Sequence, residues 1–305
     1  MDHITHPILR TGLRLMFKLP STLPLPTPIL RQAMEISAQL FKTRPEVQVE
    51  NCLIGGVPAE RISTGAAHKK IIIHLHGGAF FAGSAKTHRA LASEISARTD
   101  FTCYVLNYRL APEHPYPAAL DDAMAAYRAL IDQGTNPEDI IIGSDSGGCA
   151  HALSLAIALR DQQLPLPSGQ FMISPFLDLS LSNPSVNKNK NRDPMVTAYA
   201  LRRGADGYRG NLPAEDSRVS PLFADLEGLP PTLVQMGKDE ILVDDALIFE
   251  RLAKQAGMEI KNQIYDGMWH NFQMFNAMSK TAKKALDEIA DFITLLDHSG
   301  SVSSQ

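Results

Sequence analysis

The stretch "DIIIGSDSGG", residues 139–148, decides the fold, because a short apolar run ends there in a corner of small residues. Such a corner is typical of a tight turn from a strand into a helix, with the pattern G-x-S-x-G and the serine at the tip. One alignment of the glycines places Asp145 at the tip. Another, shifted by one residue, places Ser146 there and puts Ser144 where a glycine is usual. Only the second alignment provides a nucleophilic serine.

The segments on either side of this corner alternate between strand patterns and helix patterns. Short apolar runs such as "KIIIHLH" are typical of buried parallel strands, and stretches with a single apolar stripe are typical of surface helices. Strands are predicted at 47–55, 59–64, 70–76, 101–107, 139–143, 169–174, 231–237 and 259–267. Helices are predicted at 29–41, 117–132, 147–162, 243–257 and 281–297. The alternation predicts an α/β fold with a mostly parallel central sheet of about eight strands and helices on both faces.

Two segments do not follow this alternation. Residues 1–45 combine proline-rich stretches with one amphipathic helix, and residues 180–215 are first polar and then helical. We expect both to form a helical cap over one end of the sheet, above a main domain that spans residues 46–298. The polar tail, residues 299–305, is expected to be disordered.

Composition excludes several functional classes. The chain has 305 residues and a net charge of -4, so it has enough length for a core and no electrostatic attraction to nucleic acid. No apolar run is long enough for stable membrane insertion, and the N-terminus lacks the layout of a signal peptide. Three cysteines do not indicate a disulfide framework, so we expect a cytoplasmic location.

Candidate catalytic groups follow four of the strands. In such folds the active site lies at the carboxyl ends of the strands. "HGGAFFAG", residues 76–83, has two glycines that let backbone N–H groups point into a cleft, although it also fits a plain glycine turn. Ser146 precedes a helix, which favours developing negative charge, although an N-cap serine would look the same.

An acid and a histidine follow the last two strands. Lys238, Asp239 and Glu240 form one loop, and either acid could orient a histidine, whereas the acids at 244 and 245 fit helix capping. His270 follows the final strand; a lone histidine is often structural, but here it completes the order serine, acid, histidine. Agreement among four separate loops outweighs the structural explanation of each.

Two rival sites are set aside. His74 and His76 alternate along a strand, but no acidic residue is near them in the sequence, so no metal site is predicted. Cys149 lies beyond the corner, inside the predicted helix, and fits a small buried residue better than a nucleophile.

Five motifs together resemble the bacterial hormone-sensitive-lipase family of α/β-hydrolase esterases. They are "HLHGGAF", "YRLAPEHPYPAALDDA", "DSGG", "DEILVDDA" and "GMWHNF". The resemblance covers about residues 45 to 295 in matching order. It implies the α/β-hydrolase fold with a helical cap and an esterase that needs no cofactor.

The resemblance also implies the roles of individual residues. The family pattern G-D-S-A-G-G, with a proline nine residues before the serine, places the nucleophile at Ser146. Counting along the acid motif places the triad acid at Glu240, with Asp239 as the fallback, and His270 matches the family histidine. The implied oxyanion donors are Gly78, Ala79 and Gly147. Three residues depart from the family's serine motif: Ser144, Gly147 and Cys149.

The sequence therefore predicts a serine esterase for short- to medium-chain carboxylic esters, acting through an acyl-enzyme. An amidase, deacetylase or carbamate hydrolase would use the same triad, because the triad does not select the leaving group. A non-catalytic protein of this fold that binds a small molecule is the alternative from another class. The resemblance further implies a homodimer formed through the sheet edge.

Overall fold

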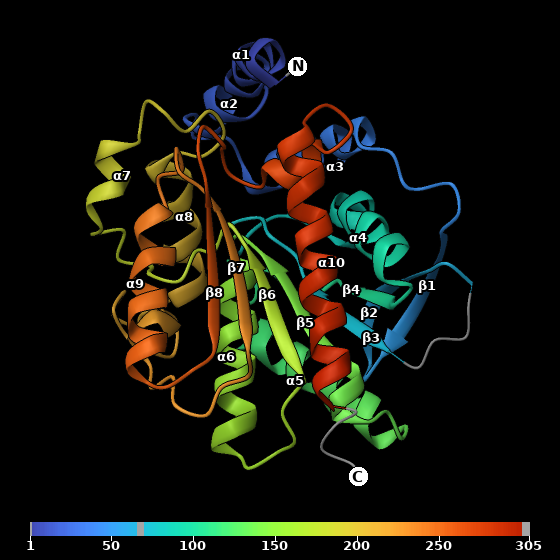
Figure 1. Cartoon of the computed structure of the whole chain (residues 1–305). Coiled ribbons are helices and arrows are strands. Elements are labelled where there is room, and N and C mark those ends of the chain that lie inside the picture. The colour runs from blue at the N-terminus through green and yellow to red at the C-terminus, as the bar shows by residue number, and fades with distance from the viewer. Residues whose placement is uncertain (1, 66–69, 301–305) are drawn as a thin grey trace.

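The computed structural model describes residues 2–65 and 70–300, and within them one eight-stranded sheet forms the centre of the molecule (Figure 1). The strands lie in the order β1-β2-β4-β3-β5-β6-β7-β8. Their bounds are β1 Gln48–Ile54, β2 Val57–Ser63, β3 Ile71–Leu75, β4 Thr102–Leu106, β5 Ile140–Asp145, β6 Gly169–Ile173, β7 Thr232–Gly237 and β8 Ile260–Tyr265. The pairs β1–β2 and β2–β4 are antiparallel, and the other neighbours are parallel. The predicted mostly parallel sheet is confirmed.

Helices cover both faces of the sheet, as predicted. Their bounds are α4 Ala85–Thr99, α5 Ala118–Asp132, α6 Gly148–Asp161, α9 Val243–Gln255 and α10 Lys280–Gly300. Short helical turns lie at η3 Pro137–Asp139, η4 Pro221–Phe223 and η5 Phe272–Phe275. Figure 1 shows α4 and α10 on one face, with α5 and α6 on the other.

The central strands explain why the sheet needs covering on both sides. Every residue of β3, β5 and β6 is buried, as expected of strands with apolar side chains on both faces. Along β5, Ile140 and Ile142 join the core beneath α5 and α6, whereas Ile141 joins the core beneath α4 and α10. Alternate side chains of one apolar run thus anchor two different helical layers.

The sequence pattern did not predict α4. Its buried side includes Thr87, His88, Ser93 and Ser96, so the apolar periodicity that indicates a helix is weak there. The helix is fixed instead by a capping box, in which Ser84 and Thr87 satisfy each other's backbone N–H groups.

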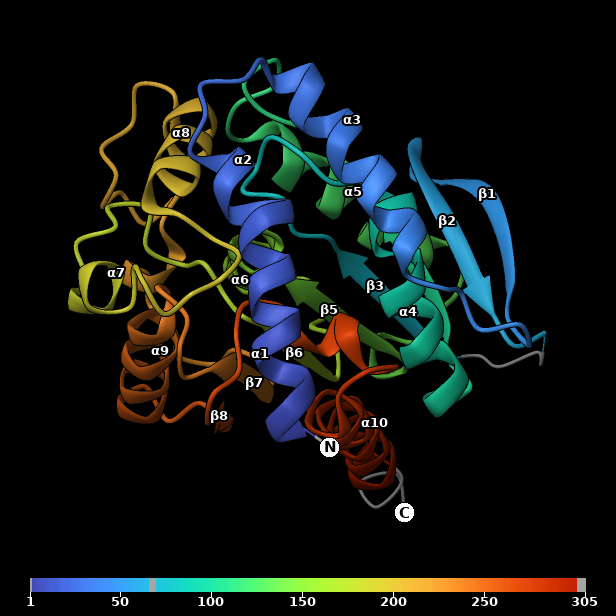
Figure 2. The ribbon, with the colours of Figure 1, turned by 90° about the horizontal axis from the view of Figure 1, so that it is seen from above.

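Two segments lie across the end of the sheet where the parallel strands finish, as Figure 2 shows from above. The N-terminal one contains α1 Asp2–Leu13, the π-helix η1 Arg14–Lys18, α2 Leu19–Ser21, α3 Thr27–Ser37 and η2 Ala38–Leu40. The internal one contains α7 Pro184–Lys188 and α8 Ala198–Arg209. Both therefore stand over the loops that carry the candidate site.

The C-terminal boundary differs slightly from the expected one. Ser299 and Gly300 were assigned to a disordered tail but form the end of α10. The rest of that predicted tail, residues 301–305, lies outside the described residues. No helix among residues 2–65 and 70–300 combines the length and apolar character needed to cross a bilayer.

Candidate active site

The corner between β5 and α6 has the geometry of a nucleophile elbow. The strand ends at Asp145 and the helix begins at Gly148, which leaves Ser146 at the tip of the turn. Ser146 adopts a left-handed φ of +51°, and its N–H donates to the Ile173 carbonyl at 2.9 Å. A Cβ at position 148 would lie 2.0 Å from the Leu75 carbonyl oxygen, so glycine is required there. The structure thus places Ser146, not Asp145, at the tip.

Ser144 and Cys149 are accommodated beneath this elbow. Ser144 lies within β5, fully buried, and its Oγ donates to the Phe171 carbonyl at 3.2 Å and to the Cys149 sulfur at 3.3 Å. Cys149 is fully buried as well, and burial raises the pKa of its thiol well above the ordinary value. The serine that replaces a family glycine is therefore part of the strand and does not occupy the turn, and Cys149 is an inert buried thiol.

Three side chains from different loops form a continuous hydrogen-bonded chain. Ser146 Oγ donates to His270 Nε2 at 2.8 Å, and His270 Nδ1 donates to Glu240 Oε2 at 2.8 Å. Glu240 is fully buried, and its other oxygen accepts from Ser174 Oγ at 2.8 Å and from the Gly237 N–H at 2.6 Å. This is the arrangement of a nucleophile, a general base and an orienting acid.

The environment of His270 favours its protonated form. Burial lowers the pKa of the imidazole, but the hydrogen bond and the negative charge of Glu240 outweigh burial and raise that pKa above its ordinary value. Glu240 can therefore stabilise the imidazolium that forms when the base takes a proton.

Asp239, the fallback acid, points elsewhere. Its Oδ2 accepts from Arg10 Nη1 at 2.8 Å, so it pairs with α1 of the N-terminal segment. The acid that contacts the histidine is Glu240.

Backbone N–H groups of the loop after β3 lie against the elbow. Gly78 and Ala79 adopt positive φ values of +129° and +48°, and a Cβ on Gly147 would lie 3.3 Å from the Phe80 nitrogen. Within the described part of the chain, the N–H groups of Gly78, Ala79 and Gly147 donate to no protein acceptor. These three N–H groups are thus free to hold a developing oxyanion.

A cavity of about 590 Å³ includes Ser146, His270, Gly78 and Ala79 in its wall. Most of the remaining wall is apolar and comes from the two segments over the sheet, although Phe81, Ala82 and Met274 of the main domain also contribute. It includes Met16, Phe17, Leu30, Met34, Phe41, Met195 and Val196. The cavity can take an apolar group and present a bond to the serine.

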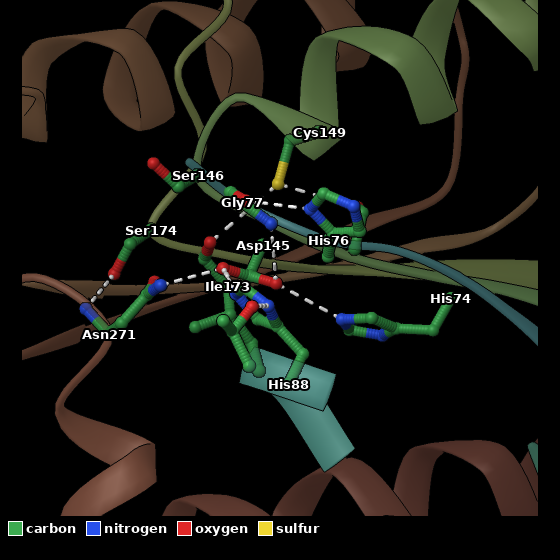
Figure 3. A network of polar contacts seen from close by, with 12 residues as sticks. His74, His76, Gly77, His88, Asp145, Ser146, Cys149, Ile173, Ser174 and Asn271 are labelled. Carbon is green, nitrogen blue, oxygen red and sulfur yellow. Dashed lines mark hydrogen bonds and ion pairs between the residues drawn. The ribbon is translucent and has the colours of Figure 1, made fainter. Parts of the chain in front are cut away.

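A buried polar network surrounds Asp145, directly beside the serine (Figure 3). Its Oδ1 accepts from His74 Nε2 and from the Gly77 N–H, each at 3.0 Å. Its Oδ2 accepts from Asn271 Nδ2 at 2.7 Å and lies 3.2 Å from His88 Nε2. This network explains the polar side of α4, because His88 reaches the sheet to contact Asp145.

Asp145 is ionised despite complete burial. Burial alone would raise the pKa of its carboxyl, but the charge of His88 and the hydrogen bonds from His74 and His88 outweigh burial and hold that pKa well below the ordinary value. The pKa of His88 is raised, because Asp145 outweighs the effect of burial there too.

The neighbouring histidines do not gather as metal ligands. His74 faces Asp145, whereas the ring of His76 stacks on Tyr108 with centroids 4.3 Å apart. Burial lowers the pKa of His76 to about 3, so this ring is neutral. Among the residues that the structure describes, no group of three or more histidine, cysteine, aspartate or glutamate side chains is placed to hold a metal ion.

The structure brings together the six site residues named from the sequence: Ser146, Glu240, His270, Gly78, Ala79 and Gly147. Sequence patterns missed Ser174, His88 and Asn271. Asn271 directly follows the candidate histidine, which was the one signal available for it. Nothing in the sequence connects His88 or Ser174 to the site, because both act only through contacts made in the folded chain.

The chain matches known proteins over most of its length. A family model described as alpha/beta hydrolase fold matches residues 72–274. An esterase of Acinetobacter venetianus is 44% identical over 286 residues, which cover 93% of this chain and 94% of that protein. An acetyl-hydrolase of Streptomyces hygroscopicus is 33% identical, over 79% of this chain and 80% of that protein.

Solved structures of similar proteins match the fold of this chain. A crystal structure of an esterase from the bacterial hormone-sensitive lipase family superimposes with a TM-score of 0.90 at 34% identity, covering 95% of this chain and 97% of that one. An esterase crystal soaked with p-nitrophenyl butyrate gives a TM-score of 0.91 at 36% identity, covering 96% and 98%. The chain belongs to the α/β-hydrolase fold family and, within it, to the bacterial hormone-sensitive-lipase esterases, which confirms the resemblance seen in its motifs.

Proposed function

We propose that this protein is a serine carboxylic-ester hydrolase that works through an acyl-enzyme. The observation that carries the proposal is the chain Ser146–His270–Glu240, with 2.8 Å at each link, opening into an apolar cavity. Its relatives named esterase and acetyl-hydrolase support the same class of reaction.

In the proposed acylation step, Ser146 Oγ attacks the ester carbonyl while His270 Nε2 takes the hydroxyl proton. His270 then gives this proton to the departing alcohol. Glu240 keeps the imidazole in the required tautomer, because its oxygen accepts from Nδ1 at 2.8 Å. A water molecule, activated by the same histidine, attacks the acyl-enzyme and releases the acid.

The N–H groups of Gly78, Ala79 and Gly147 hold the oxygen that becomes negative in each tetrahedral intermediate. The cavity wall contains Gly78 and Ala79 beside Ser146, which supports this role. Donors of this kind are typically worth about 10²–10³-fold in rate each. Because they are backbone groups held in a fixed loop, little reorganisation is required during the reaction.

Residues 1–45 and about 180–215 form the cap that shapes the substrate pocket above the main domain, residues 46–298. Side chains from both segments line the cavity, including Phe17, Met34 and Met195. This mostly apolar wall favours neutral esters with short to medium acyl chains. The proposed pocket thus selects substrates by fit to apolar side chains.

The test is hydrolysis of p-nitrophenyl esters from acetate to palmitate by wild-type protein and the Ser146→Ala variant. We expect a maximum at short to medium chains, and a loss of about 10⁴–10⁶-fold in kcat in Ser146→Ala. Ser144→Ala is the matched control, because Ser144 is a buried serine two residues away. Among the described residues, its Oγ forms hydrogen bonds with Phe171 and Cys149 and with no member of the triad.

Retention of most activity by Ser146→Ala would overturn the assignment. A faster reaction with a p-nitroanilide of the same acyl group would move the assignment to an amidase with the same triad. Tight binding of the esters without any release of p-nitrophenol would favour the non-catalytic alternative.

Two finer proposals concern the surroundings of the enzyme. Within the described residues, β8 is an edge strand whose one neighbour is β7, which supports a homodimer formed through this edge, measurable by light scattering. Cys52, Cys103 and Cys149 are all free thiols, which supports a reducing, cytoplasmic location, measurable by cell fractionation.

A further inference from the structure

Asn271 occupies a demanding position beside the proposed base. It directly follows His270, and its backbone adopts the left-handed conformation with φ of +52° and ψ of +37°. The residue is 7% exposed, so its side-chain amide is enclosed by protein. A buried amide needs hydrogen-bond partners; among the described residues its Nδ2 has one, whereas its Oδ1 has none.

Two contacts attach Asn271 to other parts of the site. Its side-chain Nδ2 donates to Asp145 Oδ2 at 2.7 Å, and its backbone N–H donates to Ser174 Oγ at 3.0 Å (Figure 3). Ser174 in turn donates to Glu240 Oε1 at 2.8 Å. The backbone contact therefore leads to the triad acid, and the side-chain contact leads to the residue that precedes Ser146.

Asp145 is a firm anchor for that side chain. Each of its carboxylate oxygens meets two groups, so its acceptor capacity is used by His74, Gly77, His88 and Asn271. The loop after β3 also packs tightly against the Asp145 carboxylate, because a Cβ on Gly77 would lie 2.3 Å from Asp145 Oδ2. Hydrogen bonds to a buried, ionised carboxylate are about twice as strong as those between neutral groups.

We propose that Asn271 is a positioning residue, whose amide attaches the loop carrying His270 to Asp145 and so keeps His270 Nε2 in reach of Ser146. The proposal rests on the proposed function, since it concerns the same acyl-transfer site. Asn271 donates to no reacting atom, so it acts through the placement of His270. The same Asp145 oxygens hold the Gly77 N–H, which links the histidine loop to the loop of the oxyanion donors.

A purely conformational explanation of Asn271 competes with this one. Asparagine tolerates the left-handed region better than most residues, so it could be required only for its backbone. Asn271→Gly separates the two explanations, because glycine adopts positive φ freely and removes only the amide contact to Asp145.

For Asn271→Gly we expect kcat for a p-nitrophenyl ester to fall about 10–100-fold, because a small displacement of the base costs this much in an otherwise intact site. KM should stay within about threefold, since the cavity wall is unchanged apart from the amide. A cooperative thermal transition, followed by circular dichroism, verifies that the variant is folded. A folded Asn271→Gly enzyme with wild-type kcat would overturn the positioning role.

Asn271→Asp gives a second test, because it replaces the attractive contact with Asp145 by a repulsive one. It places a carboxylate against Asp145, and two carboxylates at this distance share one proton until the pH rises. His74 and His88 contact Asp145, and His270 and Glu240 lie on the side of Asn271. The other titratable groups that interact with the Asp145 charge are His76, Tyr108 and Cys149. As the shared proton is lost, repulsion should displace the histidine loop, so kcat should fall with rising pH through a titration absent from wild type.

The matched control is Asn276→Asp, which adds the same charge after η5. Among the described residues, the Asn276 side chain donates only to the Gln273 carbonyl, at 3.4 Å. It should show the wild-type pH profile. An Asn271→Asp profile identical to wild type would overturn the proposal. Absence of ester hydrolysis in wild-type protein would overturn the proposed function itself. An active wild-type enzyme with unaffected variants would overturn only the role of Asn271.

Discussion

Asp239 and Glu240 are adjacent acids at the end of β7, yet they serve opposite sides of the molecule. Glu240 is fully buried and accepts hydrogen bonds from His270, Ser174 and the Gly237 N–H. The side chain of Asp239 is 17% exposed and pairs with Arg10 of α1, at 2.8 Å. One step along the backbone separates an acid that orients the proposed base from an acid that fastens the N-terminal segment.

The difference shows that the direction in which each carboxylate points decides its role, and that acid strength and position in the sequence do not. Both residues are carboxylic acids in the same turn, and both follow the same buried strand. The turn directs Glu240 inward, where Ser174 and Gly237 fix its carboxylate before it meets the histidine. It directs Asp239 outward, towards a guanidinium from the other end of the chain. One turn of the backbone therefore contacts both the triad histidine and the N-terminal part of the cap.

The largest difference is expected when each acid is removed in turn. Glu240→Ala should lower kcat by about 10³–10⁴-fold, because His270 loses the partner that sets its tautomer and stabilises its imidazolium. Asp239→Ala should keep kcat within about threefold, because Asp239 makes no contact with the histidine. Steady-state hydrolysis of p-nitrophenyl butyrate measures both variants side by side.

The two variants control for each other, since each removes one acid from the same turn. Equal losses in kcat would mean that the turn as a whole, and not the Glu240 carboxylate, supports the reaction. A larger loss in Asp239→Ala than in Glu240→Ala would reverse the assignment of the triad acid.

Asp239 and Glu240 also show which features of the site can be predicted from the sequence. Glu240 was found by counting along a motif, and the counting succeeded because the strand and helix on either side have fixed lengths in the fold. The partner of Asp239 could not be found that way, because Arg10 lies 229 residues away and meets it only when the cap folds over the sheet. Motifs near strand ends predict the chemistry; contacts between distant segments need the folded chain.

The same limit explains the network around Asp145. In the sequence, His74 was weighed only together with His76 as a weak metal motif, because the carboxylate that His74 contacts lies 71 residues further along the chain. Helix α4 was missed because it carries His88 inward among polar neighbours. The sheet, the other main helices and the triad obey simple apolar periodicity or local motifs, and these were predicted.

The pH dependence of the reaction should also distinguish the two acids, with a smaller effect. Wild-type kcat/KM should rise with pH as His270 loses its proton, and the midpoint should lie above the ordinary histidine pKa of about 6.5, because Glu240 outweighs burial. In Glu240→Gln burial still lowers the pKa of His270, and only the weaker effects of the Asp193 and Asp145 charges oppose it, so the midpoint should move down. A pH profile of the residual activity, with Asp239→Asn as the matched variant, measures the shift.

The direction of the shift is the decisive quantity. Glu240→Gln keeps the size of the side chain but removes the charge that favours the imidazolium. Asp239→Asn removes the same charge one residue away, where it pairs with Arg10. An upward shift in Glu240→Gln, or an equal shift in both variants, would contradict the assignment of Glu240 as the partner that sets the pKa of His270.

The smallest expected effect belongs to the outward acid. Arg10 donates to Asp239, to the Gly267 carbonyl at 3.1 Å and to the Arg192 carbonyl, so it joins α1 to three loops around the site. Arg10→Ala should raise KM about 2–5-fold for a p-nitrophenyl hexanoate, because a partly exposed pair contributes roughly 0.5–1 kcal/mol to the position of the cap. The value of kcat should change less than twofold, since the triad is untouched.

Arg44→Ala is the matched control, because Arg44 belongs to the same N-terminal segment but pairs at the surface with Glu46, at 2.5 Å, and more distantly with Glu94 of α4, at 4.0 Å, away from the cavity. It should leave KM unchanged. Raised salt should move the wild-type KM towards that of Arg10→Ala, since screening weakens a partly exposed ion pair. An unchanged KM in Arg10→Ala would mean that the other contacts of α1 and η1 hold the cavity wall, and that the outward acid fastens a cap which is already in place.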